Sequence, residues 1–340
     1  MTKASVCINI LILLLLLSCK QSEKDVVIEY YQKGKLNGAV LLAKNNVIIC
    51  DTILGYSDFD RKILFQKQTS FYIASLAKPI TAIGIMLLQQ NNLLNYNDSA
   101  GKYIQELPEY AKNVTIKQLL THTSGIKDYE GILDDKNLTN EQVLNWLNTQ
   151  STLNFTPGSK YEYSNSGYII LAKIIETISG KPLDLFLKEN IFQPLKMERT
   201  FVFKETTVQT VPKAIGFDKD KYLDDYRQLT TGDGGVYSTV EDLYKLDKAL
   251  REGVLINKAN TELMYQQPIL SNGNSGEYGF GWFISKSPER IAMHTGGLNG
   301  FRSLFWRDLE NDITLIVLTN QGDAFSVNDF LDEMRETMKK

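Results

Sequence analysis

Strand-like segments lie at both ends of this chain, and a long stretch with helical patterning separates them. Near the N-terminus, residues 38–43 and 47–54 are apolar and β-branched, and Asn45-Asn46 between them is a hairpin signal. The same pattern returns near the C-terminus at 279–285, 291–294, 301–307 and 313–319. Segments that are far apart in the sequence therefore have to complete one sheet, which predicts one large domain.

The middle of the chain predicts helices, because apolar residues recur there at helical spacing. The segments with this spacing are 80–89, 116–120, 141–147 and 168–178. Ser238 and Glu241 form a capping-box pattern ahead of a further helix at 243–250, and an amphipathic segment at 327–338 closes the chain. We therefore expect an α/β fold. Its sheet would come from about 30–75 and 275–340, and a mostly α lobe would be inserted at about 80–230.

The first residues predict an export signal. Lys3 precedes the apolar run 10–17, which is shorter than the roughly 20 residues that a membrane-spanning helix needs. We expect residues 1–18 to be removed. Ser18-Cys19 at the end of the run resembles a bacterial lipoprotein signal, in which Cys19 is lipidated and becomes the new N-terminus. The alternative is an ordinary secretory signal that contains this cysteine.

The lipoprotein hypothesis predicts how the mature chain is organised. Residues 19–29 would form a tether, and residues 30–340 would form a single folded domain. The lipid at Cys19 would hold the protein at the cell envelope, as a periplasmic or outer-membrane lipoprotein. Cys50 is then the one cysteine of the folded domain, and its apolar neighbours predict a small core residue.

Composition narrows the classes of function. A formal net charge of -3 gives no electrostatic case for nucleic-acid binding. The chain has only two histidines, His122 and His294, and no His-Glu-x-x-His spacing, so it lacks the ligands of a zinc hydrolase. Neither a Gly-x-Ser-x-Gly motif nor a Gly-rich phosphate loop is present. We expect no metal, no cofactor, and a small-molecule or short-peptide substrate.

A serine nucleophile without a histidine base can use a desolvated lysine, which Ser-x-x-Lys spacing places on the same helix face. The spacing occurs three times, at Ser75/Lys78, Ser99/Lys102 and Ser124/Lys127. The second and third pairs lie among turn-forming residues, so chance explains them. Ser75 instead follows the strand-like residues 71–73 and precedes the helical segment, and Pro79 is compatible with a first helical turn. Ser75 is therefore the candidate nucleophile, with Lys78 as its base.

Two further motifs carry groups that suit such a site. In Tyr163-Ser164-Asn165, a Tyr hydroxyl beside a cationic Lys can shift toward phenolate and shuttle a proton, and Asn offers a donor and an acceptor to a substrate amide. His294-Thr295-Gly296-Gly297 ends an expected strand, where glycines let a substrate lie along the strand edge. Each motif alone is also typical of packed core residues.

Taken in order, Ser75-Leu76-Ala77-Lys78, Tyr163-Ser164-Asn165 and His294-Thr295-Gly296 resemble the motifs of class C β-lactamases and D-alanyl-D-alanine carboxypeptidases. Residues 119–125, 157–158 and 234–239 are similar to further signatures of these penicillin-binding-type serine hydrolases, so the resemblance covers about 30–335. It implies an antiparallel sheet flanked by helices, a mostly α lobe, and an active site between them.

The resemblance also implies a role for each motif residue. Ser75 would be acylated, Lys78 and Tyr163 would exchange its proton, and the backbone N–H groups of Ser75 and Gly297 would form the oxyanion hole. The substrate-binding residues would be Asn165, His294, Thr295 and Gly297. His122 resembles a structural residue.

One position departs from the β-lactamase pattern. Most class C β-lactamases carry Lys where this chain has His294, which puts efficient β-lactamase activity in doubt. We expect His294 to contact a substrate carboxylate and to gain charge as the pH falls through its usual pKa of about 6.5.

Three functions stay open at this point. The first is an acyl-enzyme hydrolase of D-amino-acid peptides, amides or esters, of the D,D-carboxypeptidase, D-aminopeptidase or esterase type. The second is a class C-like β-lactamase. The third is a penicillin-binding or sensing module, or a degenerate scaffold, that does not release the acyl group. All three retain Ser75, so the deacylation rate distinguishes them.

Overall fold

The computed structural model describes residues 21–133, 137–204, 211–225, 229–285, 288–298 and 300–339. The expected signal peptide and Cys19 lie outside the described residues. Within these ranges, no helix is both long enough and apolar enough to cross a membrane.

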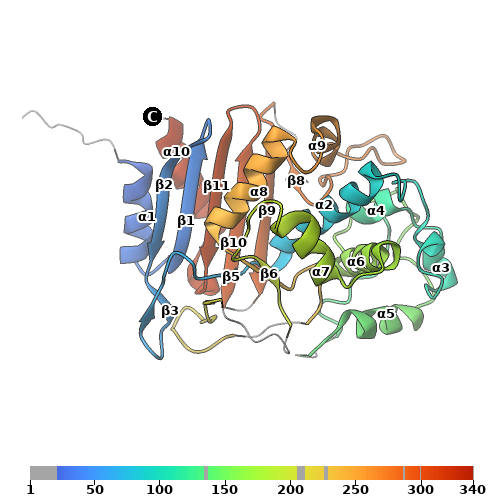
Figure 1. Ribbon diagram of the computed structural model, residues 1–340, viewed down its shortest axis with the longest axis horizontal. Coiled ribbons are helices and arrows are strands. Elements are labelled where there is room, and N and C mark those ends of the chain that lie inside the picture. Colours follow the sequence, from blue (N-terminus) through green and yellow to red (C-terminus); the bar gives the residue numbers. More distant parts are fainter. Residues whose placement is uncertain are drawn as a thin grey trace, which may run out of the picture.

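In the described part of the chain, a six-stranded antiparallel sheet forms the centre of the fold (Figure 1). Its strands are β1 (Gly38–Lys44), β2 (Val47–Leu54), β8 (Phe283–Ile284), β9 (Ile291–Leu298), β10 (Phe301–Asp308) and β11 (Ile313–Thr319), in the spatial order β2-β1-β11-β10-β9-β8. β1 pairs with β11 from Gly38↔Thr319 to Lys44↔Ile313. N-terminal and C-terminal segments therefore complete one sheet, as the sequence predicts.

The strand predicted at 279–285 is shorter than expected. Only Phe283 and Ile284 form β8, because the residues before them make a tight turn. The Gly279 N–H donates to the Trp282 carbonyl at 2.8 Å, and Gly281 has a φ of 84°. This left-handed backbone favours glycine and interrupts the strand.

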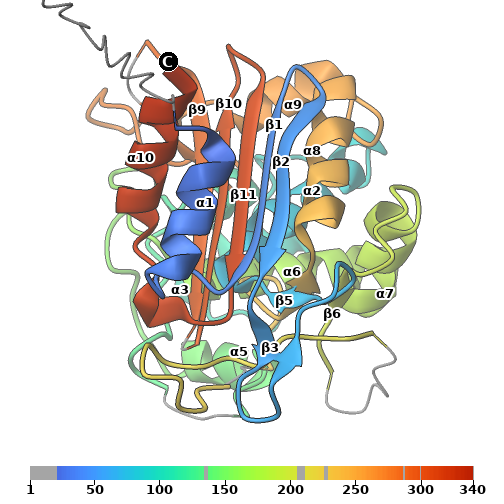
Figure 2. The same ribbon diagram turned by 90° about the vertical axis from the view of Figure 1, so that its left-hand side faces the viewer.

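Helices cover both faces of the sheet (Figure 2). The four covering helices are α1 (Glu23–Gln32), α2 (Ala77–Gln90), α8 (Val240–Glu252) and α10 (Val327–Lys339). In β11, Leu315 and Val317 join the apolar cluster beneath α1 and α10, while Ile316 and Leu318 join the larger core on the side of α2 and α8. Burial on both faces explains why these strands are nearly continuous apolar runs.

Helix α1 corrects the prediction of a tether over 19–29. The helix begins at Glu23, inside that segment, and Ser22 caps it through a capping box with Asp25. Val26 is fully buried, and the Tyr30 ring packs edge-on against Phe330 of α10 with centroids 4.9 Å apart. The segment starts with polar residues, so its sequence does not reveal the apolar face that the helix buries.

A mostly helical lobe follows α2, as predicted. Its elements are η2 (Ala100–Lys102), α3 (Glu109–Lys112), α4 (Ile116–Leu120), α5 (Asn140–Asn148), α6 (Asn165–Ser179), α7 (Leu183–Leu187) and η3 (Lys188–Phe192). The short helix α9 (Lys258–Met264) lies between α8 and β8 in the sequence. α2 is buried over most of its length and packs against α6, which places the two motif-bearing helix starts side by side.

Two small sheets complete the fold. β3 (Tyr56–Asp58) pairs with β4 (Ile63–Leu64), while β5 (Phe71–Tyr72), β6 (Phe201–Val202) and β7 (Val236–Ser238) form a second sheet in the order β5-β7-β6. β5 leads directly toward α2, so this small sheet sets the position of the helix start.

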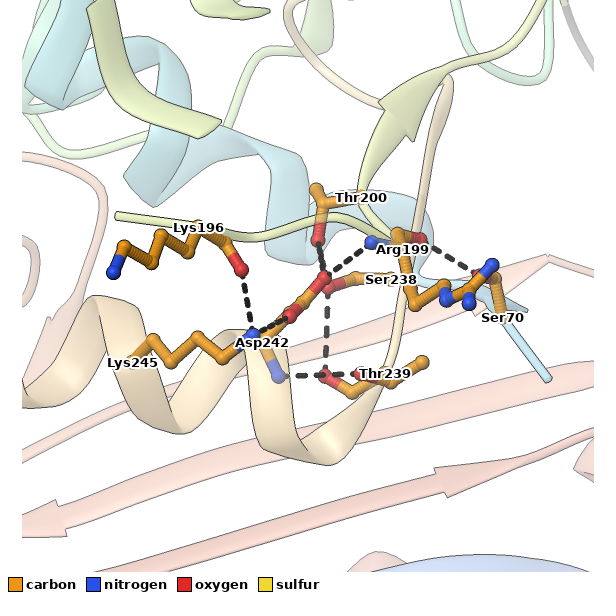
Figure 3. Close-up of polar contacts among 8 residues, drawn as sticks. All are labelled: Ser70, Lys196, Arg199, Thr200, Ser238, Thr239, Asp242 and Lys245. Carbon is orange, nitrogen blue, oxygen red and sulfur yellow. Dashed lines mark hydrogen bonds and ion pairs between the residues drawn. The ribbon is translucent and has the colours of Figure 1, made fainter. Parts of the chain in front are cut away.

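A buried carboxylate ties the small sheet to α8 (Figure 3). Asp242 is 1% exposed, and its Oδ2 accepts from the Arg199 N–H at 2.8 Å and the Thr200 hydroxyl at 3.0 Å. Its Oδ1 accepts from Lys245 Nζ at 2.6 Å. The Arg199 carbonyl in turn accepts from the Ser70 hydroxyl at 2.7 Å, next to β5.

The start of α8 differs by one residue from the predicted capping box. Thr239 is the N-cap, and its hydroxyl accepts from the Asp242 N–H at 3.2 Å. Ser238 instead ends β7, and its hydroxyl lies 2.8 Å from that of Thr200. Thr at the N-cap satisfies an N–H group that the first helical turn leaves without a partner.

We expect Asp242→Ala to lower the free energy of unfolding by about 2–4 kcal/mol, because it leaves buried donors without their charged acceptor. Urea denaturation followed by circular dichroism measures this. Asp332→Ala, on the exposed face of α10, is the matched control and should change the free energy by less than about 0.5 kcal/mol. Equal effects of the two substitutions would contradict the role given to Asp242.

Candidate active site

Ser75 lies in a short 3-10 turn, η1 (Ala74–Leu76), between β5 and α2. The Ile73 N–H donates to the Val236 carbonyl at 2.9 Å, and the Ile73 carbonyl accepts from the Ser303 hydroxyl at 2.9 Å. Ala74 has a φ of 47°, a left-handed backbone that a non-glycine residue rarely adopts. The small β5-β7-β6 sheet and the six-stranded sheet therefore both contact a strained turn immediately before the serine.

Gly296 allows β9 to approach this turn. A Cβ atom at this position would lie 2.2 Å from the Ile73 carbonyl oxygen and 2.4 Å from the Ser303 hydroxyl. Only glycine fits there, so the Thr-Gly of the third motif brings the strand edge up to the serine turn.

In the structure, the side chain of Lys78 contacts that of Ser75. Lys78 Nζ donates to the Ser75 hydroxyl oxygen at 3.1 Å, and its side chain is fully buried at the start of α2. Two other acceptors hold the same nitrogen, Asn165 Oδ1 at 2.7 Å and the Asp233 carbonyl at 2.9 Å.

The two other Ser-x-x-Lys pairs are not sites of this kind. Lys102 binds Asp98 at 2.9 Å, and Lys127 binds Gln150 at 3.2 Å. Both lysines use their amines in local contacts. The prediction that separated Ser75 from the chance matches is therefore consistent with the geometry.

Burial lowers the pKa of Lys78 from 10.5 to about 8, although the negative charges of Asp233, Asp128 and Glu130 oppose the shift. The neutral amine is therefore accessible near physiological pH. A neutral amine within hydrogen-bonding distance of a hydroxyl can accept its proton.

Tyr163 lies on the other side of the serine. Its ring centroid is 4.8 Å from Lys78 Nζ, and its hydroxyl is close enough to Ser75 for that residue to influence the pKa of the phenol. Burial raises the pKa of this phenol, and Ser75 only partly opposes that rise. Burial therefore favours the protonated phenol in this structure, which opposes the expected shift toward phenolate.

His294 is buried and differs from its predicted role. Its Nδ1 lies 2.6 Å from the Thr295 carbonyl oxygen, which can only accept, so Nδ1 carries the proton. Its Nε2 then accepts from the Tyr278 hydroxyl at 2.7 Å. Burial, together with the nearby charge of Lys78, lowers the pKa of His294 to about 3. The prediction that His294 gains charge near pH 6.5 is wrong, because burial keeps this imidazole neutral. Its contact with a substrate carboxylate stays a prediction.

His122 has the structural position that was expected. It is 1% exposed, its Nδ1 accepts from the Ser164 N–H at 3.1 Å, and its ring packs at a tilt against that of Tyr163 with centroids 4.2 Å apart. Burial holds the pKa of His122 well below its usual value. This neutral ring fixes the backbone and the aromatic ring of the second motif.

Three of the predicted residues line one pocket. Ser75, Asn165 and Gly297 all line it. Both N–H groups of the Asn165 amide are already used, by Asp128 Oδ2 at 3.0 Å and Glu130 Oε2 at 2.6 Å. Its contact with a substrate amide stays a prediction, as does substrate binding by Thr295, whose carbonyl contacts His294.

Sequence reasoning missed the acidic residues of this pocket. Glu130 and Asp233 line it beside Tyr129, and Asp128 accepts a hydrogen bond from the Asn165 amide. Asp233 immediately precedes the Gly234-Gly235 signature, which is the one signal that could have drawn attention to it. Among the residues that the structure describes, no cluster of three or more His, Cys, Asp or Glu side chains is arranged to hold a metal ion.

A model of the β-lactamase family matches residues 24–334. Penicillin-binding protein 4* of Bacillus subtilis (strain 168) is 33% identical over 319 residues, which cover 86% of this chain and 70% of that protein. A penicillin-binding protein structure from Bacillus halodurans is 26% identical with a TM-score of 0.79, over 91% of this chain and 99% of that one.

A D-amino acid amidase from Ochrobactrum anthropi SV3, solved in complex with D-phenylalanine, has a TM-score of 0.78 at 24% identity. The alignment covers 93% of this chain and 98% of the amidase. At this identity the similarity shows a shared fold.

We expect the rate at which a fluorophosphonate labels Ser75 to rise with pH around a midpoint of about 8, because protonated Lys78 cannot accept the hydroxyl proton and neutral Lys78 can. No step should occur near pH 6.5, since both histidines stay neutral. Timed intact-mass measurements give the rate, corrected for hydrolysis of the reagent without protein. A step near pH 6.5 that His294→Gln abolishes would contradict the assignment.

Proposed function

The chain belongs to the β-lactamase family of serine hydrolases, and on that premise we propose that Ser75 forms an acyl-enzyme with D-amino-acid peptides, amides or esters, which water then releases. The observation that carries the proposal is the contact of a buried lysine with the serine at 3.1 Å, next to a protonated tyrosine.

The proposed acylation step follows from these protonation states. Neutral Lys78 accepts the proton of the Ser75 hydroxyl as the oxygen forms its bond to the substrate carbonyl carbon. The negative charge that develops on the carbonyl oxygen is bound by the backbone N–H groups of Ser75 and Gly297. Protonated Tyr163 donates to the leaving amine or alkoxide, and the proton on Lys78 restores Tyr163.

Deacylation reverses these roles. Water replaces the leaving group, loses its proton to the Lys78 and Tyr163 pair, and attacks the acyl carbonyl. The Ser75 oxygen leaves and recovers a proton. A penicillin-binding or sensing module would stop before this step, whereas a class C-like β-lactamase would complete it with a lactam.

The test is a panel of four substrates: a D-Ala-D-Ala peptide, a D-amino-acid amide, a short-chain p-nitrophenyl ester and a chromogenic cephalosporin. We expect turnover of at least one of the first three, and its loss by at least about 100-fold in Ser75→Ala. Intact mass should show one phosphonate adduct in the wild type and none in the variant. Persistent labelling of Ser75→Ala, or a stable acyl-enzyme with all four compounds, would overturn the proposal.

We also propose that Cys19 carries lipid and holds the protein at the cell envelope. The support is the sequence alone: a short apolar run that ends at Ser18-Cys19. The full-length chain, expressed in a bacterium, should enter the detergent phase on Triton X-114 separation, and Cys19→Ser should remain in the aqueous phase. Detergent partitioning that survives this substitution would contradict lipidation at Cys19.

A further inference from the structure

Negatively charged side chains surround the serine pocket. Glu130 and Asp233 line it, and Asp128 accepts a hydrogen bond from the Asn165 side chain. Lys78 is the cation that they face, and its amine is already bound by three acceptors. No lysine or arginine is among the described residues that line the pocket. With its carboxylates ionised, the site carries more negative than positive charge.

Asp233 gives a second and independent indication of a ligand. Asp233 is 4% exposed and is one of the residues that line the pocket, and its Oδ2 accepts from the Tyr129 hydroxyl at 2.6 Å. Its Oδ1 accepts no hydrogen bond from another described residue. A buried carboxylate oxygen without a donor is unfavourable by roughly 1–3 kcal/mol. A donor from a bound molecule would relieve that penalty.

Among the described residues that line the pocket, a substrate carboxylate finds no cationic partner. His294 occupies the position at which a lysine would supply positive charge, but its two nitrogens are used by Thr295 and Tyr278 and it is neutral. Arg302 pairs across the strands with Gly297, where its guanidinium donates to the Phe301 carbonyl at 3.0 Å and lies 3.4 Å from Asp323. Asp323 is thus an anionic partner for Arg302.

We propose that Glu130 and Asp233, supported by Asp128, form a subsite for the free ammonium group of a D-amino-acid amide, ester or peptide N-terminus. This proposal rests on the proposed function and selects the aminopeptidase and amidase type within it. The chain would therefore favour substrates whose acylating residue bears a free amine over N-acylated substrates and over peptides selected by their terminal carboxylate.

The covalent structure of such substrates fits this position. The ammonium nitrogen is two bonds from the carbonyl carbon that Ser75 attacks, so it has to lie within the serine pocket. It would there approach Lys78, and the repulsion between two cations is unfavourable unless carboxylates screen it. Three carboxylates close to Lys78 provide this screening.

Glu130 is also arranged to exchange partners. One of its oxygens accepts from Asn165 at 2.6 Å, and the residue is solvent-exposed, so its side chain can turn without disturbing the core. Transfer of Glu130 from the Asn165 amide to the substrate ammonium would release one Asn165 N–H group. That group could then donate to a carbonyl of the substrate, the contact predicted from the motif.

The experiment compares D-alanine p-nitroanilide with N-acetyl-D-alanine p-nitroanilide, which differ in the charge of the amine. The measured quantity is the ratio of their kcat/KM values in the wild type, Glu130→Gln, Asp128→Asn and Glu109→Gln. Glu130→Gln retains an oxygen acceptor for Asn165 and removes the charge. Glu109→Gln, in α3 at the surface of the helical lobe, is the control for loss of one negative charge elsewhere.

We expect the wild type to favour the free amine by at least about 10-fold, the scale of a charge-assisted hydrogen bond at a partly exposed site. Glu130→Gln should reduce the ratio by about 10-fold, and Asp128→Asn by less, since it acts through Asn165. Glu109→Gln should leave the ratio unchanged.

Equal rates with the two anilides in the wild type would overturn the subsite, as would a ratio that Glu130→Gln does not alter. A preference for N-acetyl-D-Ala-D-Ala that Arg302→Gln abolishes would instead identify a carboxylate-selecting enzyme. Hydrolysis of p-nitrophenyl acetate separates the two proposals. If this ester is turned over through Ser75 without an amine preference, only the subsite fails; if neither the ester nor any peptide or amide is turned over, the proposed function fails.

Discussion

The buried amine of Lys78 is the constraint on which the rest of the site depends. Removing an ammonium group from water is unfavourable by several kcal/mol unless it is hydrogen-bonded and balanced by nearby charge. The structure supplies both, through Asn165, the Asp233 carbonyl and the surrounding carboxylates. Asn165 starts α6 and Lys78 starts α2, so the packing of these two helices holds base and nucleophile together.

This arrangement explains why the sheet is assembled from both ends of the chain. The serine turn is held on one side by β7 and on the other by Ser303 of β10, and Gly296 lets β9 approach it closely. β9 and β10 are C-terminal strands, whereas Ser75 lies in the first quarter of the sequence. The pairing of β1 with β11 closes the sheet that supports these contacts. The active-site turn therefore depends on contacts from both the N-terminal and the C-terminal parts of the domain.

The sequence predicts the parts of this molecule that depend on local pattern. Strand and helix positions follow apolar periodicity, and Ser75 is distinguished from two chance matches by the strand before it and the helix after it. Protonation states could not be predicted in this way. Burial of His294 against Tyr278, and of Tyr163 against His122, shifts their pKa values through contacts between distant segments. Helix α1 was missed because its buried face emerges only from packing on α10.

The tuning of Lys78 and the charge of the pocket are physically linked. Burial alone would lower the pKa of this amine further, and the carboxylates raise it again to about 8. Each carboxylate that stabilises the protonated base also makes the pocket less favourable for an anionic substrate and more favourable for a cationic one. A lysine at position 294 would place a second cation near Lys78. It would lower the pKa of the Lys78 amine and would also attract a substrate carboxylate. This chain instead has a neutral His294 and three acidic residues, which raise the pKa of Lys78 and disfavour an anionic substrate. The same charges therefore set both the strength of the base and the preferred charge of the substrate.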